Sequence, residues 1–482
     1  MELFNYISML SKKIVNDKMD FSEVEEEVFT MVKALGTLVL EAVLQEADER
    51  MYQSAARKGK SEGFRRQGVN TLFGEIVYKR RLYRLRDERN QSTKWYYPLD
   101  ETLGLRDKQT ISPSIEKTSA YLATEVSYRK SEKMLKQLGI QVSHETIRNH
   151  VQKYGKAIKQ KQEQLSKEEG LGERASEVIM VESDGIYISL QGKDREKRKR
   201  HEIKVGCQYE GWEKADPAGS KYCLKNPHVL ATVGSSDAFW DQVDRQLLTT
   251  YDLDQVSLMV FGSDGAPWAK EGLDRYPQAI HQIDAYHFTK WITRVFGFDS
   301  QGIVDTISSL IHADDQEGFN TFMTHCREAK KASKAQIEAL RTMILRHWES
   351  LKDYRTRDVH LPDIARGIGN IENINDILVA DRMKKRGMSW SIRGADHLIQ
   401  VRASIQNGEW ADVCQWVLRQ AEVVEKRTEK TKETKRKRGR RKTGQLREEQ
   451  TVAWCQAHMP GAEGSEQWLR DFSKALQNTF IA

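Results

Sequence analysis

The alternation of apolar and polar residues divides the chain into helical and strand-like stretches. From residue 1 to about 60, apolar side chains recur every three or four positions, which predicts helices that pack on a core or dimerise. In residues 178–190, four apolar residues precede a carboxylate, Asp184, and apolar and polar side chains alternate after it. This pattern predicts a β-strand. A buried carboxylate costs free energy unless its charge is compensated, so the strand predicts that Asp184 has a partner, of which a metal ion is one kind.

The order of the later elements predicts the fold class. Three strand-like pieces are followed by helix, strand, helix and strand, and then by an all-helical stretch of about residues 289–365. This order predicts a ribonuclease-H-like α/β core, in which an antiparallel meander leads into parallel crossovers. The whole chain is therefore expected to be α+β and multidomain, with a helical insertion in its catalytic core.

The same patterns predict six segments. They are an N-terminal helical region (1–60), a basic β-rich module (61–105), a helix-turn-helix domain with a linker (106–172), the core domain (173–420), a basic flexible segment (421–450) and a C-terminal helix (451–482).

Residues 112–155 carry a helix-turn-helix pattern. Two helices are predicted before Gly139, and Ser143 is a good N-cap for a third helix over residues 144–154. Ile147 and Val151 would face inward on that helix, while its outer face could reach base edges in a major groove. The alternative is an ordinary three-helix subdomain. The predicted DNA-reading residues are Arg148, Asn149 and Lys153.

Three further basic clusters suggest contact with nucleic acid, although the first could equally be a solvated face and the third is alternatively a solvated linker. The first lies among tyrosines on a predicted strand pair, the second at a hairpin tip after residue 190, and the third in the low-complexity stretch 424–447. Their members are Lys79, Arg80 and Arg81, then Arg198, Lys199 and Arg200, and then Lys435, Arg436, Lys437 and Arg438.

Composition narrows the class of protein. The 482 residues include 77 basic and 70 acidic side chains, a net charge of only +7, so local clustering matters more than the total. The five cysteines lack the spacing of a zinc finger, which predicts reduced thiols in a cytoplasm. No apolar run approaches the ~20 residues of a membrane span, so no membrane partner is expected.

Two more acids are candidates to join Asp184. Asp264 ends a predicted strand, where ligands bind in such sheets, and Glu372 opens a helix after the helical stretch. An Asp-Gly pair is more often a turn, and a glutamate there could merely complement the helix dipole. Glu182, on the same strand face as Asp184, is a weaker alternative ligand. Three carboxylates without a Cys/His set predict Mg²⁺ or Mn²⁺, two ions together, as in phosphodiester chemistry.

These residues carry a resemblance to a known family. The chain resembles bacterial insertion-sequence DDE transposases of the ISLre type, which are related to Mutator-like transposases. The stretches that carry the resemblance are residues 71–84, 127–133 and 143–147, Glu182-Ser-Asp-Gly185, Gly262-Ser-Asp-Gly265, Asp284-Ala-Tyr-His-Phe288, Gly369-Asn-Ile-Glu372 and residues 382–390.

The resemblance implies a function and a set of site residues. Asp184, Asp264 and Glu372 would be the catalytic, metal-binding acids, and Asp284-Ala-Tyr-His287 is similar to the C/D-x-x-H motif of Mutator-like transposases. His287 would then either orient a metal-bound water or phosphate or be structural. The implied protein is a cytoplasmic, nucleoid-associated homo-oligomer that binds double-stranded DNA, cleaves at element ends and transfers strands to target DNA. Two alternatives stay open: a ribonuclease-H-like nuclease and a non-catalytic DNA-binding regulator.

Overall fold

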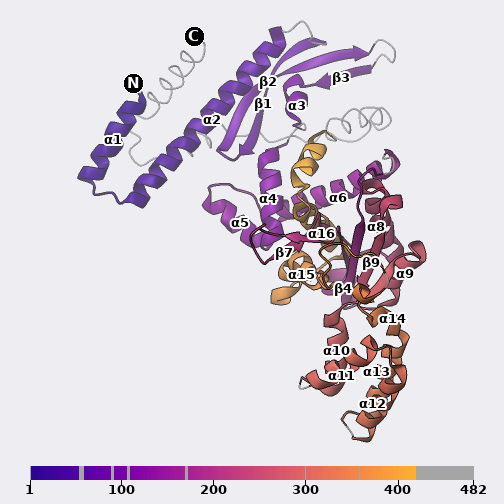
Figure 1. The fold of residues 1–482 in the computed structure, drawn as a ribbon. Helices are drawn as coiled ribbons and strands as arrows, with labels where there is room; N and C mark the ends of the chain where they lie inside the picture. Colours follow the sequence, from indigo (N-terminus) through magenta and orange to yellow (C-terminus); the bar gives the residue numbers. More distant parts are fainter. Residues whose placement is uncertain are drawn as a thin grey trace. The chain divides into compact units, whose positions relative to one another are not determined.

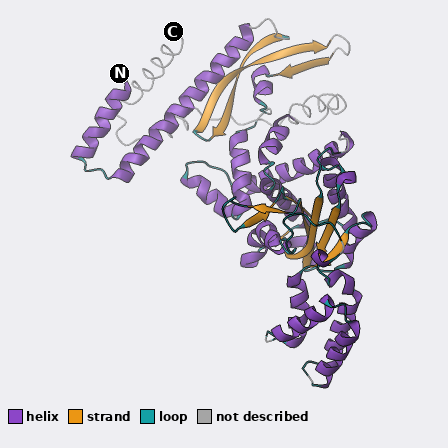
Figure 2. Ribbon diagram, in the orientation of Figure 1, coloured by secondary structure: helices purple, strands orange, loops and turns teal. Residues whose placement is uncertain are grey.

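The structure is a computed structural model that describes residues 2–53, 59–87, 92–105, 109–168, 172–298, 300–329, 331–357 and 359–419 (Figure 1). The fold is α+β (Figure 2). Two compact units form, one mainly from Met1–Thr118 with Lys133–Val142 and the other from Ser119–Glu132 with Ser143–Val417. The predicted basic segment, with Lys435, Arg436, Lys437 and Arg438, and the predicted C-terminal helix lie outside the described residues.

The first unit is a small sheet packed on a long helix. The amphipathic stretch forms α1 (Glu2–Asn16) and α2 (Phe21–Gln53), and α3 (Pro98–Leu103) follows the sheet. The sheet has the order β1 (Lys60–Thr71), β2 (Gly74–Asp87) and β3 (Ser92–Tyr96), all antiparallel. Leu44 of α2 packs with Val69, Ile76 and Tyr78 of the sheet, so one face of the predicted hairpin is buried.

The predicted helix-turn-helix elements are all present. They are α4 (Pro113–Glu125), α5 (Tyr128–Gln137) and α6 (His144–Glu168), and the division between the two units passes through α4 and α5. Gly139 has φ +72°, a left-handed conformation that ends the preceding helix. The Thr146 N–H donates to Ser143 Oγ at 3.2 Å, as expected of an N-cap.

Helix α6 is longer than its predicted span, and its second half packs on α16 (Ile392–Gln406). Lys159 of α6 pairs with Asp396 of α16 at 2.7 Å. Gly155 lies so close to the backbone of His397 that a Cβ there would come within 2.4 Å of its carbonyl oxygen. Exposed residues near the start of α6 therefore sit on a helix anchored to the second unit's core.

The second unit is built on a mixed sheet with the order β10-β9-β4-β5-β8. The β4–β5 and β5–β8 pairs are antiparallel, whereas β4–β9 and β9–β10 are parallel. The bounds of these strands are β4 (Val178–Leu190), β5 (Arg200–Tyr209), β8 (His228–Thr232), β9 (Leu258–Ser263) and β10 (Ile280–Ile283). Smaller elements are α7 (Gly192–Lys197), β6 (Trp212–Lys214), β7 (Tyr222–Leu224), η1 (Leu253–Gln255) and β11 (Ser389–Trp390), which pairs with the end of β4.

The two faces of β4 pack against different elements, because successive side chains point to opposite sides of a strand. Ile179 and Val181 join an apolar cluster with α8 (Ser236–Thr250) and β9, beside which α9 (Pro267–Arg275) packs. Glu182 and Asp184 point to the other face, where α15 (Ile371–Asn375) contacts β4 and β5. On that side of β4 the two acids lie between Met180 and Ile186, which are both buried, and we call this side of the sheet the acidic face.

The predicted all-helical insertion is confirmed as helical. Its elements are α10 (Ala285–Phe296), α11 (Gln301–His312), α12 (Gln316–Glu328), α13 (Lys334–Arg346), α14 (Trp348–Leu351) and η2 (Tyr354–Thr356). These helices project from the sheet in Figure 1 and have their own core around Ile307, Phe319 and Ile344. The chain then returns to the sheet through three short helices: α15, the π-helix η3 (Asp376–Lys384) and the 3-10 helix η4 (Lys385–Gly387). Within the described residues, none of the helices has the length and apolar character to cross a membrane.

Candidate active site

Asp184 lies in the middle of β4 and is 7% exposed. Strand pairing with β5 continues through it, so Asp184-Gly185 is not a turn. The Gly185 N–H donates to Asp184 Oδ1 at 2.8 Å, and the Asn375 amide donates to Oδ2 at 2.6 Å. Both hydrogen bonds hold the carboxylate in one orientation on the acidic face of the sheet.

Asp264 follows the last residue of β9, the strand beside β4. Ser263 pairs with Ser183, so strand register brings Asp264 level with Asp184. The Ala266 N–H donates to Asp264 Oδ1 at 2.8 Å in the turn before α9. Gly265 has φ +82°, which a residue with a side chain rarely adopts, so this tight turn explains the Asp-Gly pair.

His287 is held in place by Asp284 at the start of α10. Asp284 is the N-cap: its Oδ1 accepts the His287 N–H at 2.8 Å, and its Oδ2 lies 2.7 Å from His287 Nδ1. This second contact assigns the proton to Nδ1 and leaves Nε2 for the site. Nε2 lies 3.2 Å from Glu372 Oε1 and 4.0 Å from Asp184 Oδ1.

The three predicted acids and His287 therefore meet at one place. One oxygen each of Asp184 and Asp264 and one nitrogen of His287 lie within 4.8 Å of one another. Glu372, the second residue of α15, reaches the group through its contact with His287, and its side chain is 33% exposed. The four residues come from separate segments of the chain that only the fold brings together.

The electrostatics of the group reflect burial and crowding of like charges. Burial raises the pKa of Asp184 to about 6; His287 opposes this rise, and the charges of Asp264 and Glu372 add to it. Burial acts to lower the pKa of His287, but the hydrogen bond that His287 donates to Asp284 and the charges of Asp284, Asp184 and Glu372 outweigh it and raise that pKa. A cation placed among these groups would relieve the repulsion.

Glu182 is not available as a ligand, which corrects the expectation that it could be one. Its side chain is buried, and its oxygens accept hydrogen bonds from four donors. The donors are the Tyr209 hydroxyl (2.6 Å), the Asn370 amide (3.0 Å) and the backbone N–H groups of Gly369 (2.9 Å) and Ile371 (3.1 Å). Burial nevertheless raises the pKa of Glu182, although the four hydrogen bonds act to lower it.

The donor set fits a hard divalent cation. Carboxylate oxygens dominate it, as Mg²⁺ and Mn²⁺ prefer, and one imidazole nitrogen is added. Asn375, which holds the Asp184 carboxylate in orientation, was not predicted from the sequence. Its spacing could have indicated it, because Asn375 lies three residues after Glu372 and therefore on the same side of the helix.

The predicted recognition helix has the expected faces. Ile147 and Val151 are fully buried, and Arg148 and Asn149 are exposed. Lys153 is half-buried, with its amine 5.9 Å from the ring centre of Tyr154. The second predicted cluster is exposed: Arg198 and Lys199 lie between α7 and β5, and Arg200 is the first residue of β5.

The basic strand of the first unit requires a correction. Lys79 is exposed, but Arg80 is only 2% exposed and forms an ion pair with Asp100. Arg81 pairs with Asp48 at 2.8 Å and also with Glu49. The prediction that Arg80 and Arg81 present charge to DNA is wrong for this fold, because acids of the same unit already hold both guanidinium groups.

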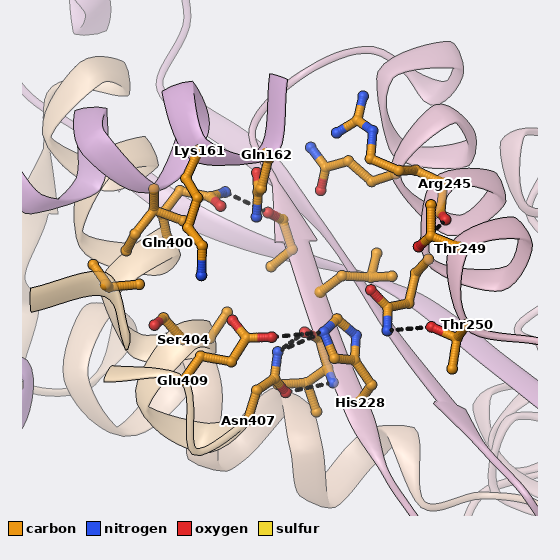
Figure 3. A pocket seen from close by; sticks show the side chains of 18 residues that line it. Lys161, Gln162, His228, Arg245, Thr249, Thr250, Gln400, Ser404, Asn407 and Glu409 are labelled. Carbon is orange, nitrogen blue, oxygen red and sulfur yellow. Dashed lines mark hydrogen bonds and ion pairs between the residues drawn. The ribbon is translucent and has the colours of Figure 1, made fainter. Parts of the chain in front are cut away.

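A cavity of about 320 Å³ lies along the outer edge of β8, and none of the four site residues lines it (Figure 3). Two amide side chains cover the strand edge there. Asn407 exchanges hydrogen bonds with the backbone N–H (2.8 Å) and C=O (2.9 Å) of Val229, and Gln400 donates to the Ala231 C=O at 2.8 Å. Such contacts protect a sheet edge from pairing with another chain.

Comparison with known proteins gives a family. The model of an uncharacterised protein family, UPF0236, matches residues 14–420. A UPF0236 protein of Streptococcus gallolyticus, whose name places it in the vanSb 3′ region, is 29% identical over 406 residues, covering 82% of this chain and 85% of the relative. A UPF0236 protein of Caldanaerobacter subterraneus subsp. tengcongensis is 24% identical over 402 residues, covering 82% and 80%, and its name joins eleven locus designations. Another from that organism, whose name joins four, is 24% identical over 401 residues, also covering 82% and 80%.

Proposed function

The chain belongs to the UPF0236 family, and we propose that it is a DNA transposase of the DDE type. It binds the ends of its element, cleaves a phosphodiester at each end and transfers the freed strand to target DNA, acting as a homo-oligomer on double-stranded DNA. The observation that carries this proposal is the convergence of Asp184, Asp264 and Glu372 with His287 on one face of a sheet.

The sheet supports the proposal. Three antiparallel strands, β4, β5 and β8, are followed by β9 and β10, each reached by a crossover and parallel to its neighbour. This is the order that a ribonuclease-H-like core would have, with Asp184 on the central strand and Asp264 at the end of the next. The helical insertion before Glu372 agrees with the architecture that the resemblance implies.

The names of two relatives also support it. One relative's name joins eleven loci of one organism, and a second name joins four. A gene carried by a self-copying element would be present at several loci in this way. A repair nuclease or a regulator is not expected in so many copies.

The residues have separable roles. A bound divalent cation would activate a water or a 3′-hydroxyl and stabilise the leaving oxygen of the phosphodiester. Asp184, Asp264 and Glu372 would hold the cation, and Asn375 keeps the Asp184 carboxylate in orientation. Asp284 fixes the ring of His287, so that Nε2 can accept or donate a proton, or join the donor set, at the edge of the site.

The proposal is tested with the purified full chain and labelled DNA taken from the ends of its own element, in Mg²⁺ or Mn²⁺. Wild type should nick the end DNA and form strand-transfer products. Asp184→Asn should lower the rate at least about 100-fold, since several kcal/mol of transition-state stabilisation are lost, while binding of the end DNA persists.

Asp274→Asn, at an exposed acid on α9, is the matched control and should retain the wild-type rate. An active Asp184→Asn enzyme refutes the proposal. Cleavage without end specificity or strand transfer would point to a nuclease, and binding without any metal-dependent cleavage would point to a regulator.

A further inference from the structure

We propose that Glu182 is a positioning residue that fixes the turn before α15 and thereby places Glu372 in the active site. This inference rests on the proposed function, because it gives Glu372 a role in the donor set. Glu182 itself would touch neither the cation nor DNA.

The hydrogen bonds of Glu182 connect two distant parts of the chain. Its Oε2 accepts the backbone N–H groups of Gly369 (2.9 Å) and Ile371 (3.1 Å), and its Oε1 accepts the Asn370 amide (3.0 Å). Glu372 is the next residue. All three residues before it are therefore tied to a single carboxylate on the central strand.

The carboxylate is itself held firmly. Glu182 is 1% exposed, lies on β4 between two hydrogen-bonded neighbours, and receives the Tyr209 hydroxyl of β5 at 2.6 Å. Charge-assisted hydrogen bonds of this kind are shorter and stronger than neutral ones. The turn is therefore anchored to the most rigid element of the unit.

The neighbouring strand leaves room for this contact. Glu182 pairs in register with Gly262 of β9. A Cβ on Gly262 would lie 2.7 Å from Ile368 Cδ1 and 3.1 Å from Glu182 Cγ. Only a residue without a side chain allows the turn to approach Glu182 this closely, so Gly262 belongs to the same arrangement.

Glu182 and Asp184 consequently have different roles on one face of β4: Glu182 holds the turn, and Asp184 lies in the site. Two residues apart, they point to the same side, but only Asp184 lies among the other acids and His287. Glu182 is occupied by donors from the turn, so its effect on the site must pass through Glu372. This gives a clear thermodynamic signature, because residues that act through one another have non-additive effects.

The test measures Mn²⁺ binding to the full chain for Glu182→Gln, Glu372→Gln and the double variant. Glu182→Gln replaces one accepting oxygen with a donor and should weaken Mn²⁺ binding about 10-fold or more, as loss of an outer-shell partner does. In the Glu372→Gln background the same change should have no further effect. Tyr209→Phe removes the Tyr209 hydroxyl from Glu182 and from the Asn370 amide (3.5 Å) but keeps the three hydrogen bonds from the turn to Glu182, so it is the comparison variant and should change affinity less than Glu182→Gln.

Amide hydrogen exchange across residues 366–378 gives a readout that needs no metal. Exchange should rise in Glu182→Gln and stay at the wild-type level in Glu372→Gln. If Glu182→Gln does not fold, Glu182→Asp, one methylene shorter, should show the same rise to a smaller extent.

Two results overturn the inference: unchanged exchange in a folded Glu182 variant, or effects of Glu182→Gln and Glu372→Gln on Mn²⁺ affinity that add. Additive effects would make Glu182 a ligand in its own right. If wild type binds no Mn²⁺, the proposed function fails, whereas exchange still decides whether Glu182 holds the turn.

Discussion

The first unit's sheet and the acidic face of the second unit handle buried charge in opposite ways. In the sheet, Arg80 pairs with Asp100, and both are nearly inaccessible to solvent. On the acidic face, Asp184 lies close to Asp264 and Glu372, and His287 is the basic group found among them in the described chain. In the first region each buried charge is paired with an opposite charge, and in the second several carboxylates lie close together.

The difference distinguishes buried charges that stabilise the fold from buried charges that are placed to bind a ligand. A buried pair needs nothing from outside the protein once it has formed. Burial raises the pKa of Asp184, and the nearby charges of Asp264 and Glu372 add to the rise, so the folded chain maintains an arrangement that a bound cation would stabilise.

Arg80→Ala should have the largest effect on stability. It leaves Asp100 buried and without its cation, which typically costs about 3–5 kcal/mol. The free energy of unfolding, measured in urea, should fall by that amount. Lys79→Ala, at the exposed neighbour, should change it by less than about 0.5 kcal/mol. Equal effects of the two substitutions would remove the structural role assigned to Arg80.

Asp184→Asn should stabilise the metal-free protein at pH 7, although it abolishes the proposed activity. The pKa of Asp184 is raised from 3.8 to about 6, so holding its charge at pH 7 costs the fold about 3 kcal/mol when each pKa unit is worth about 1.4 kcal/mol. Urea unfolding in a chelating buffer measures the gain, with Asp274→Asn as the control. A loss of stability would contradict the cost that burial and the neighbouring acids place on the Asp184 charge.

The gain from Asp184→Asn should depend on pH in a defined direction. Because the folded pKa of Asp184 lies above its unfolded value, the folded state holds this proton more tightly between pH 4 and 6. The metal-free wild type should therefore lose stability relative to Asp184→Asn as pH rises through this window, by at most about 1.4 kcal/mol per pH unit. Below pH 4 the difference should level off. A difference that is flat from pH 4 to pH 7 would contradict the raised pKa.

Lys79→Ala should have the smallest effect, and only on DNA binding. If this exposed lysine contacts one phosphate, its loss should reduce the slope of log affinity against log salt by about 1. Fluorescence anisotropy with end DNA at several salt concentrations measures the slope. Lys334→Ala, at an exposed lysine of the helical insertion, is the comparison and should leave the slope unchanged. A slope that Lys79→Ala does not alter would place this strand outside the DNA contact.

The strands and the acids of the second unit were predictable because their signals are local. Alternation in residues 178–190 marks β4, and the Asp-Gly pair after residues 258–263 marks the end of β9. Strand order then brings Asp184 and Asp264 together. Glu372 was a less local prediction, since it depended on its place at the start of a helix that follows the helical insertion.

The roles of Arg80 and Glu182 were not predictable from their own surroundings. Arg80 points away from the exposed face of Lys79, and it is buried because α2 and α3 lie on that side of the sheet. Glu182 and Asp184 share one strand face, and what distinguishes them is a turn 187 residues further along the chain. In both cases the deciding partner is distant in sequence, which no local pattern records.

The anchoring of α6 has a consequence for where DNA would be cut. Arg148 is exposed near the start of this helix, and Lys159 pairs with α16 eleven residues later, a rise of about 16 Å at 1.5 Å per residue. If Arg148 contacts the recognised bases, a single unbroken helix sets the distance between those bases and the catalytic sheet. The number of base pairs from recognition site to scissile phosphate would then be set by the length of α6.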